Sequence, residues 1–140
     1  MSRIFWDTNL FIYLFEKNAE HFAGTVKLRR KMLERRDELF TSTMTLGEVQ
    51  SKPIQQLRPD LAAAYRKAIR ATAQVISFND AAADRYAQIR ADHVTRPPDA
   101  IQLACAAIAG VDLFITNDAK LTRLNIPGIG FIVTPDRVPI

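Results

Sequence analysis

Residues 99–118, DAIQLACAAIAGVDLFITND, decide the fold class of this chain. The segment from Asp99 to Ala109 is apolar on almost every side, which is typical of a helix buried all round. Gly110 is suited to end that helix, because glycine readily adopts the left-handed conformation found there. Leu113–Thr116 is a short apolar run that predicts a strand covered on both faces. A buried helix leading into a buried strand indicates an α/β protein.

The rest of the chain alternates short apolar strands with helical segments. Further strands are predicted at Ile4–Trp6, Leu39–Ser42, Val75–Ile76 and Phe131–Val133. Helices are predicted at Leu10–Phe15, at Phe22–Arg36, from Thr45 to Ser51 with an interruption near Pro53, from Pro59 onward, from a cap at Asn79 to about His93, and briefly after Asp118. Short apolar strands between helices predict a mainly parallel sheet of about five strands. We expect a single three-layer α/β/α domain over residues 1–140.

The composition excludes several other classes of protein. Apolar residues make up 48% and charged residues 24% of the chain, which fits a globular domain and argues against disorder. The single cysteine, Cys105, excludes a disulfide framework or a multi-cysteine zinc site and fits a reducing compartment. No apolar run approaches the roughly 20 residues that span a bilayer. We therefore expect a complete, cytoplasmic protein that does not contact membranes.

Four carboxylates stand where a parallel sheet gathers its ligand-binding groups. Asp7 ends the first predicted strand, and Asp118 lies just beyond the fourth. Glu48 is predicted in the first turn of the helix after the second strand, and Asp99 opens the buried apolar helix. Ligands bind beyond the carboxyl ends of such strands, so we expect these four side chains to converge at one edge of the sheet.

Helix capping is the alternative role for each acid taken singly. Asp7, Asp99 and Asp118 are of a residue type that caps helix N-termini, and Thr45–Glu48 matches a capping box. Capping alone does not require the four side chains to converge. Like charges that do converge repel one another, and a bound cation relieves that repulsion. An all-oxygen site without histidine or cysteine suits Mg²⁺ or Mn²⁺ rather than zinc.

The sequences around the four acids resemble the PIN domain. The motifs are FWDTNLFIY around Asp7, TLGEV around Glu48, PPDAIQLACAA around Asp99 and FITNDAKL around Asp118. More narrowly, the chain resembles the VapC toxins of bacterial toxin–antitoxin pairs over nearly its whole length. The resemblance implies a Mg²⁺- or Mn²⁺-dependent endoribonuclease that hydrolyses RNA phosphodiester bonds and is silenced by a VapB-like antitoxin. It leaves the oligomeric state open, a homodimer included.

The resemblance also implies a role for each residue of the four motifs. Asp7 and Asp99 would hold the metal ion, with Asp118 as a direct or water-mediated ligand. Glu48 would orient or deprotonate the attacking water, or hold a second ion. The hydroxyl and amide side chains that support these catalytic acids are Thr8, Asn9, Thr116 and Asn117.

Basic residues accompany the acids. The formal net charge is +4, which favours polyanionic partners. Arg96 precedes Asp99 and Lys120 follows Asp118 in the sequence, which makes both candidates for substrate binding. The basic stretch Lys27–Arg36 is interpreted either as a solvated helix face or as a contact for RNA. The two histidines are predicted to lie on the surface, outside the acidic cluster.

Two other function classes stay open. A receiver-type signalling domain with a phosphoacceptor aspartate is also α/β with acids at strand ends. It requires an acidic pair before that aspartate and a lysine after the last strand, whereas Trp6 precedes Asp7 and Thr134-Pro135-Asp136 follows the last predicted strand. A noncatalytic PIN-like RNA-binding module is the third interpretation. No glycine-rich phosphate loop is present, which argues against an NTPase.

Overall fold

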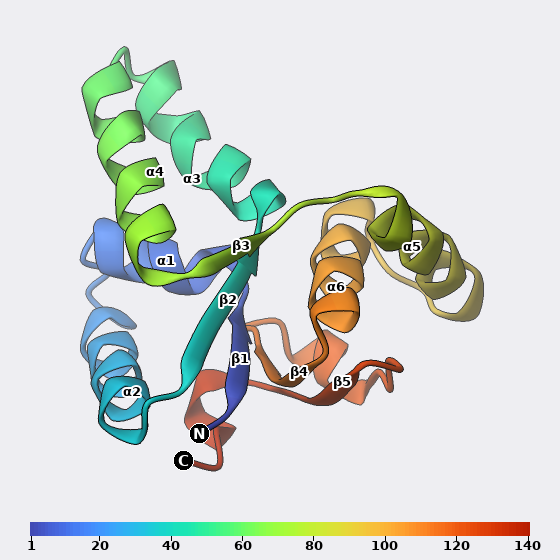
Figure 1. Ribbon diagram of the computed structural model, residues 1–140. Helices are drawn as coiled ribbons and strands as arrows, with labels where there is room; N and C mark the ends of the chain where they lie inside the picture. The colour runs from blue at the N-terminus through green and yellow to red at the C-terminus, as the bar shows by residue number, and fades with distance from the viewer.

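Five parallel strands form one sheet at the centre of the molecule, in the order β3-β2-β1-β4-β5 (Figure 1). The computed structural model describes residues 1–140. The strands are β1 (Arg3–Trp6), β2 (Glu38–Ser42), β3 (Gln74–Ile76), β4 (Val111–Ile115) and β5 (Ile129–Val133). The prediction of a parallel sheet of about five short strands is therefore confirmed.

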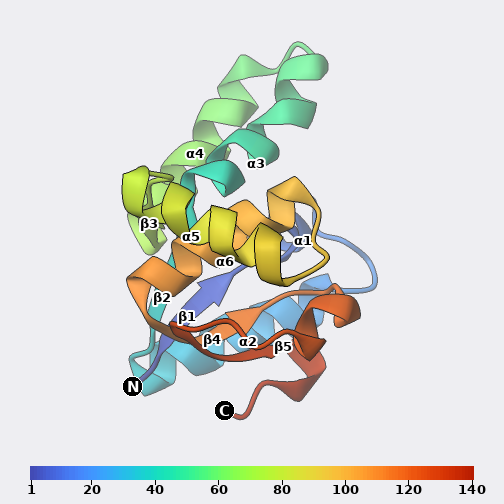
Figure 2. The same cartoon turned by 90° about the vertical axis from the view of Figure 1, so that its right-hand side faces the viewer.

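Helices cover both faces of the sheet (Figures 1 and 2). On one face lie α1 (Thr8–Phe15), α2 (Phe22–Arg35), α3 (Thr43–Gln55) and α4 (Pro59–Thr72). On the other face lie α5 (Asp80–Asp92) and α6 (Pro97–Ala109). Two short 3₁₀-helices, η1 (Ala119–Arg123) and η2 (Pro135–Arg137), flank β5 in the sequence. Every helix falls short of the length and apolar character that a membrane crossing requires.

The strands are apolar throughout because both of their faces are buried. Successive side chains of a strand point to opposite faces. The α5–α6 face carries Phe5, Phe40, Phe114 and Ile132, and the opposite face carries Ile4, Trp6, Leu39, Leu113 and Ile115. The helix α6 is enclosed between the sheet and α5, and its apolar residues from Leu103 to Ala107, Cys105 among them, are buried.

Three helices begin two residues earlier than the sequence predicted, and the first is α1, which begins at Thr8 rather than Leu10. The second is α6, which begins at Pro97 rather than Asp99, with two prolines in its first turn. The first N–H groups of a helix lack intrahelical partners, so proline loses little there. Likewise, α3 begins at Thr43, where the Ser42 hydroxyl accepts a hydrogen bond from Met44 N at 3.2 Å. It also continues through Pro53, which lies in its last turn and is buried.

The order of the strands changes direction at β1, although all strands are parallel. β2 and β3 are added on one side of β1, and β4 and β5 on the other. The chain crosses between these halves through α5 and α6, on the opposite face from α1–α4 (Figure 1). Ligands of open parallel sheets bind beyond the strand ends at such a switch point. Here that point lies where β1 ends at Trp6 and β4 ends at Ile115.

Gly128→Ala should destabilise the chain, whereas Gly47→Ala should not. Gly128 has φ +97°, and a Cβ there would lie 2.5 Å from the Ala107 carbonyl oxygen of α6. We expect the free energy of unfolding to fall by about 1–3 kcal/mol. Gly47 lies inside α3 with open space at its Cβ position, so alanine should stabilise by roughly 0.5–1 kcal/mol. Urea denaturation measures both; equal effects would contradict the close approach at Gly128.

Candidate functional site

Asp7 joins the ends of β1 and β4. Its backbone N–H donates to the Ile115 carbonyl oxygen at 3.0 Å. Its Oδ2 accepts a hydrogen bond from the Thr116 hydroxyl at 2.8 Å, and its Oδ1 accepts from Thr8 N at 2.8 Å. The bond from Thr8 N caps α1, the role that capping assigned to Asp7 in the sequence. The carboxylate is thus fixed at the switch point by the strand end on one side and the helix start on the other.

A buried polar network lies beneath this carboxylate. Gln102, on α6, is 2% exposed. Its Nε2 donates to the hydroxyl oxygens of Thr8 at 3.0 Å and Thr45 at 2.8 Å. Its Oε1 accepts from the Ser42 hydroxyl. Sequence reasoning did not identify Gln102, although it is the only polar side chain between Ala100 and Ala109.

Three of the four predicted acids line one pocket of about 260 Å³. The lining residues are Asp7, Thr8, Asn9, Ile12, Glu48, Arg96, Pro98, Asp99 and Gln102. Asp118, the fourth acid, does not line this pocket. Its N–H donates to the Thr116 hydroxyl at 3.1 Å, and its Oδ1 caps η1 by accepting from Lys120 N at 3.0 Å. Asp118 is therefore linked to Asp7 through Thr116 rather than through the pocket itself.

Capping does not account for Glu48 and Asp99. Because α3 begins at Thr43, Thr45–Glu48 lies inside the helix, and the capping box is wrong. The Glu48 Oε1 instead accepts a hydrogen bond from the Thr8 hydroxyl at 2.6 Å. Asp99 is in the first turn of α6 but forms no capping bond. Its Oδ2 accepts from Arg96 Nε at 3.2 Å.

Burial, hydrogen bonds and neighbouring charges shift the pKa of Asp7 and of Arg96. Burial raises the pKa of Asp7 above its ordinary value, hydrogen bonds from Thr116 and Thr8 oppose the rise, and the charges of Asp99 and Glu48 add to it. The hydrogen bond to Asp99 raises the pKa of Arg96. The charges of Asp118 and Asp7 reinforce that rise. A cation is thus favoured at this place.

The donor set fits Mg²⁺. No three Asp, Glu, His or Cys side chains are grouped closely enough to hold one ion by themselves. Mg²⁺ usually keeps several waters and takes only one or two carboxylates from the protein. Asp7 and Asp99 present carboxylate oxygens to one pocket that histidine and cysteine do not line. The negative charges of Asp99 and Glu48 repel that of Asp7, and a bound ion would offset this repulsion.

The other predicted residues take different places. Asn9 is exposed and lines the pocket. Asn117 is exposed and does not line the pocket, and its Nδ2 donates to the Tyr13 Oη at 2.8 Å. Lys120 is exposed and does not line the pocket. Tyr13 was not identified from the sequence, because its link to Asn117 spans 104 positions.

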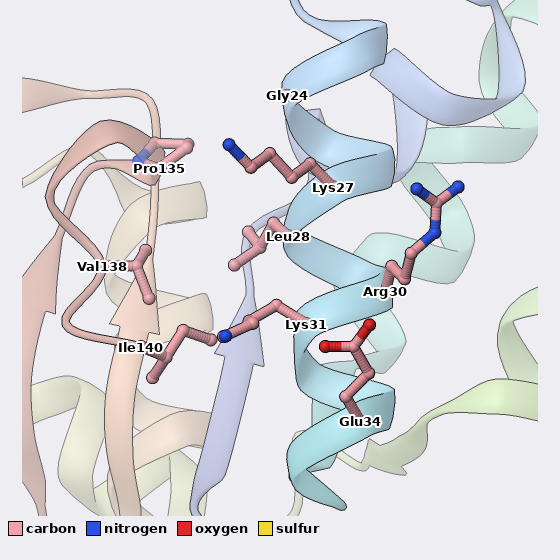
Figure 3. A pocket seen from close by; sticks show the side chains of 9 residues that line it. All are labelled: Gly24, Lys27, Leu28, Arg30, Lys31, Glu34, Pro135, Val138 and Ile140. Atoms are coloured by element: carbon pink, nitrogen blue, oxygen red, sulfur yellow. The ribbon is translucent and has the colours of Figure 1, made fainter.

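The largest cavity lies elsewhere. It has a volume of about 580 Å³ and runs between α2 and the C-terminal segment (Figure 3). Glu34 is the only acid that lines it, beside Lys27, Arg30 and Lys31. The carboxylate chemistry therefore belongs to the smaller pocket.

Comparisons with known proteins agree with the fold. The family model of the PIN domain matches residues 4–127. A DNA-bound VapBC from Salmonella typhimurium is 24% identical, with TM-score 0.71, covering 96% of this chain and 99% of that one. A toxin–antitoxin complex from Klebsiella pneumoniae is 26% identical, with TM-score 0.66 and coverage of 96% and 98%. VapC20 from Mycobacterium tuberculosis, described as a sarcin–ricin loop cleaving toxin, is 16% identical, with TM-score 0.67 and coverage of 89% and 97%. No curated protein sequence matches the chain.

Asp7→Asn should change how stability depends on pH in metal-free buffer. At a pH below the ordinary aspartate pKa, the wild-type carboxyl is protonated in both the folded and the unfolded chain. As the pH rises through the raised pKa of folded Asp7, wild type loses stability that the asparagine variant keeps, at roughly 1.4 kcal/mol per pKa unit. The difference in unfolding free energy should therefore move in favour of the variant with rising pH.

The measurement is thermal denaturation over a pH series. Asp84→Asn is the matched control, because Asp84 is exposed on α5 and should show no such trend. A difference that moves the other way would mean that Asp7 is stabilised as a carboxylate.

Proposed function

The chain belongs to the PIN domain family, and we propose that it is a metal-dependent endoribonuclease toxin of the VapC type. The observation that carries this proposal is the meeting of Asp7, Glu48 and Asp99 in one pocket at the switch point between β1 and β4. The likeness to solved toxin–antitoxin structures supports it. The substrate is RNA, and the reaction is hydrolysis of a phosphodiester bond.

Asp7 and Asp99 would hold a Mg²⁺ or Mn²⁺ ion, with Asp118 acting directly or through water. When bound, the metal lowers the pKa of a water molecule and neutralises charge that develops on the phosphate. Thr116 keeps Asp7 Oδ2 in place through its 2.8 Å hydrogen bond, and it also accepts from Asp118 N. One buried hydroxyl thus positions two of the acids.

Glu48 would act as the base toward the attacking water. Its Oε1 receives the Thr8 hydroxyl hydrogen, which leaves Oε2 free to accept a proton. Gln102 donates to the Thr8 oxygen. Because an ionised Glu48 can only accept, the Thr8 hydroxyl must donate to it. The chain from Gln102 through Thr8 therefore fixes the direction in which Glu48 points.

Arg96 and Lys120 would bind the phosphates of the substrate. The Arg96 side chain is 77% exposed and touches Asp99, which is 14% exposed. An exposed guanidinium at the mouth of an acidic pocket can exchange its carboxylate for a phosphate oxygen. Lys120 is exposed, and its backbone N–H donates to the Asp118 carboxylate that caps η1.

We also propose that the protein is cytoplasmic and that two copies of the chain can form a homodimer. A VapB-like antitoxin would inhibit the enzyme. A pocket that holds three carboxylates attracts a guanidinium, which can pair bidentately with a carboxylate. An arginine of the antitoxin could therefore compete with the metal for Asp7 and Asp99.

Asp7→Asn and Asp99→Asn should abolish cleavage of RNA without unfolding the chain. Purified wild type should cleave RNA in Mg²⁺ and stop in EDTA. Each variant should lose at least about 100-fold in kcat, because outer partners of a metal alone cost 10- to 100-fold. Asp84→Asn is the control with the same charge change. Expression of wild type should arrest growth, and Asp7→Asn should relieve the arrest.

Each contrary result selects a different function. A folded wild type that binds RNA in Mg²⁺ without cleaving it would be a noncatalytic module. Phosphorylation of Asp7 by a small phosphodonor would instead indicate a receiver-type domain.

Thr8→Val should lower kcat by roughly 10- to 100-fold, because the variant lacks the hydroxyl that orients Glu48. Thr8→Ser keeps the hydroxyl and should stay within a few fold of wild type. Steady-state kinetics and Mg²⁺ titration separate this effect from loss of metal binding. Equal losses in both variants would show that the methyl packing of Thr8, not its hydrogen bond, supports the site.

A further inference from the structure

An aromatic pair, Tyr13 and His21, is hydrogen-bonded to the segment that follows β4. Asn117, between Thr116 and Asp118 in the sequence, donates from Nδ2 to the Tyr13 Oη at 2.8 Å. The Tyr13 ring stacks on the imidazole of His21, with ring centroids 4.3 Å apart and planes inclined by 24°. The stack is therefore tied directly to the strand end that carries the site. Nothing in the proposed hydrolysis uses it.

His21 is held in place but keeps part of its surface open. Its backbone N–H donates to Asn18 Oδ1 at 2.9 Å, and its carbonyl oxygen accepts from the Thr25 hydroxyl at 2.8 Å. Its side chain is 32% exposed. One face of the ring is covered by Tyr13, and the Glu20 carboxylate lies 3.7 Å from Nε2, which leaves the remaining ring surface open to a ligand. Such a surface can stack on a base with little loss of side-chain entropy.

A basic groove begins at the same edge of the sheet. His21 immediately precedes α2, whose residues from Gly24 to Glu34 form one wall of the 580 Å³ cavity. The other wall is the segment that follows β5, from Pro135 to Ile140 (Figure 3). β5 ends at Val133, whose carbonyl oxygen accepts from Thr116 N at 3.0 Å. The upper end of the groove therefore adjoins the strand ends that carry the acidic site.

Two lysines extend into this groove. Lys27 and Lys31 are one helical turn apart and both point from α2 toward the C-terminal segment (Figure 3). Neither forms an ion pair or a side-chain hydrogen bond. Leu28 and Val138 supply apolar surface between the walls. The groove therefore offers two unneutralised ammonium groups above an apolar base.

We propose that single-stranded RNA runs from the acidic pocket across the Tyr13–His21 stack into the groove of α2, where Lys27 and Lys31 hold its phosphates. This path rests on the proposed function and adds a direction to it. A basic track joined to an aromatic platform is the combination that binds single strands. One base would stack on His21, which would make His21 a positioning residue for the scissile phosphate. Paired bases cannot splay onto the ring, so duplex RNA should bind less well.

The stacking step is tested with His21→Ala, His21→Leu and His21→Phe. A labelled short single-stranded RNA is titrated in EDTA by fluorescence anisotropy, and KM and kcat are measured in Mg²⁺. Alanine and leucine should weaken binding by about 5- to 150-fold, the fold-change that loss of one base–aromatic stack produces. Phenylalanine should retain binding. The loss should appear mainly in KM, and Mg²⁺ affinity should be unchanged. Leucine guards against a fold defect in the alanine variant.

The groove is tested through the salt dependence of binding. The double variant Lys27→Ala, Lys31→Ala should flatten the slope of log K against log salt by about 1.4, because each phosphate neutralised on a single strand contributes about 0.7. The matched control is Lys67→Ala, Arg70→Ala on α4, which removes the same charge from exposed positions. The control should change the slope much less than the groove variant does.

The outcomes separate the path from the proposed function. If wild type neither binds nor cleaves RNA, both fail. If wild type cleaves RNA but His21→Ala and His21→Leu bind it normally, or both double variants share one slope, the path alone is overturned. If the lysine variant binds RNA normally but loses affinity for a polyglutamate peptide, the groove is a protein-docking surface and the path is wrong.

Discussion

The hydrogen bonds of Asp7 to the end of β4 set the geometry of everything around the site. A parallel sheet brings the ends of neighbouring strands to one edge, but it does not by itself fix the side chains that follow them. Here the Asp7 N–H and the Thr116 hydroxyl close a link between β1 and β4. Thr116 then accepts from Asp118 N, so the fourth acid is placed by the same hydroxyl. The arrangement needs a short polar residue at each strand end, which is what Asp-Thr-Asn and Thr-Asn-Asp provide.

The second support comes from the helix that is otherwise apolar. A buried polar side chain is costly unless each of its groups is paired. Gln102 satisfies that condition by bonding Ser42, Thr45 and Thr8, which belong to the end of β2, to α3 and to α1. One amide therefore ties three elements together beneath Asp7. Its burial also means that the network is dry, which strengthens its hydrogen bonds.

The sequence predicted the sheet because its strands are short, apolar and separated by helices, and this signal is local. Asp7 was correctly recognised as a cap for the same reason. The errors arose where two local patterns compete. Thr45–Glu48 matches a capping box, but the N-cap of α3 is Ser42, three residues before Thr45. The Gln102 network could not be predicted, because its partners are 57 to 94 residues away in the sequence and no periodicity links them.

Cys105 lies in the middle of the helix that also carries Gln102. Burial raises the pKa of its thiol to about 11, and only the thiolate reacts readily with alkylating agents or oxidants. The sulfur therefore stays inert at neutral pH while α6 is docked, and becomes reactive only when that helix leaves the sheet. Since α6 also supplies Asp99, the rate of thiol modification would report how often the native chain opens the very element on which the acidic pocket is built.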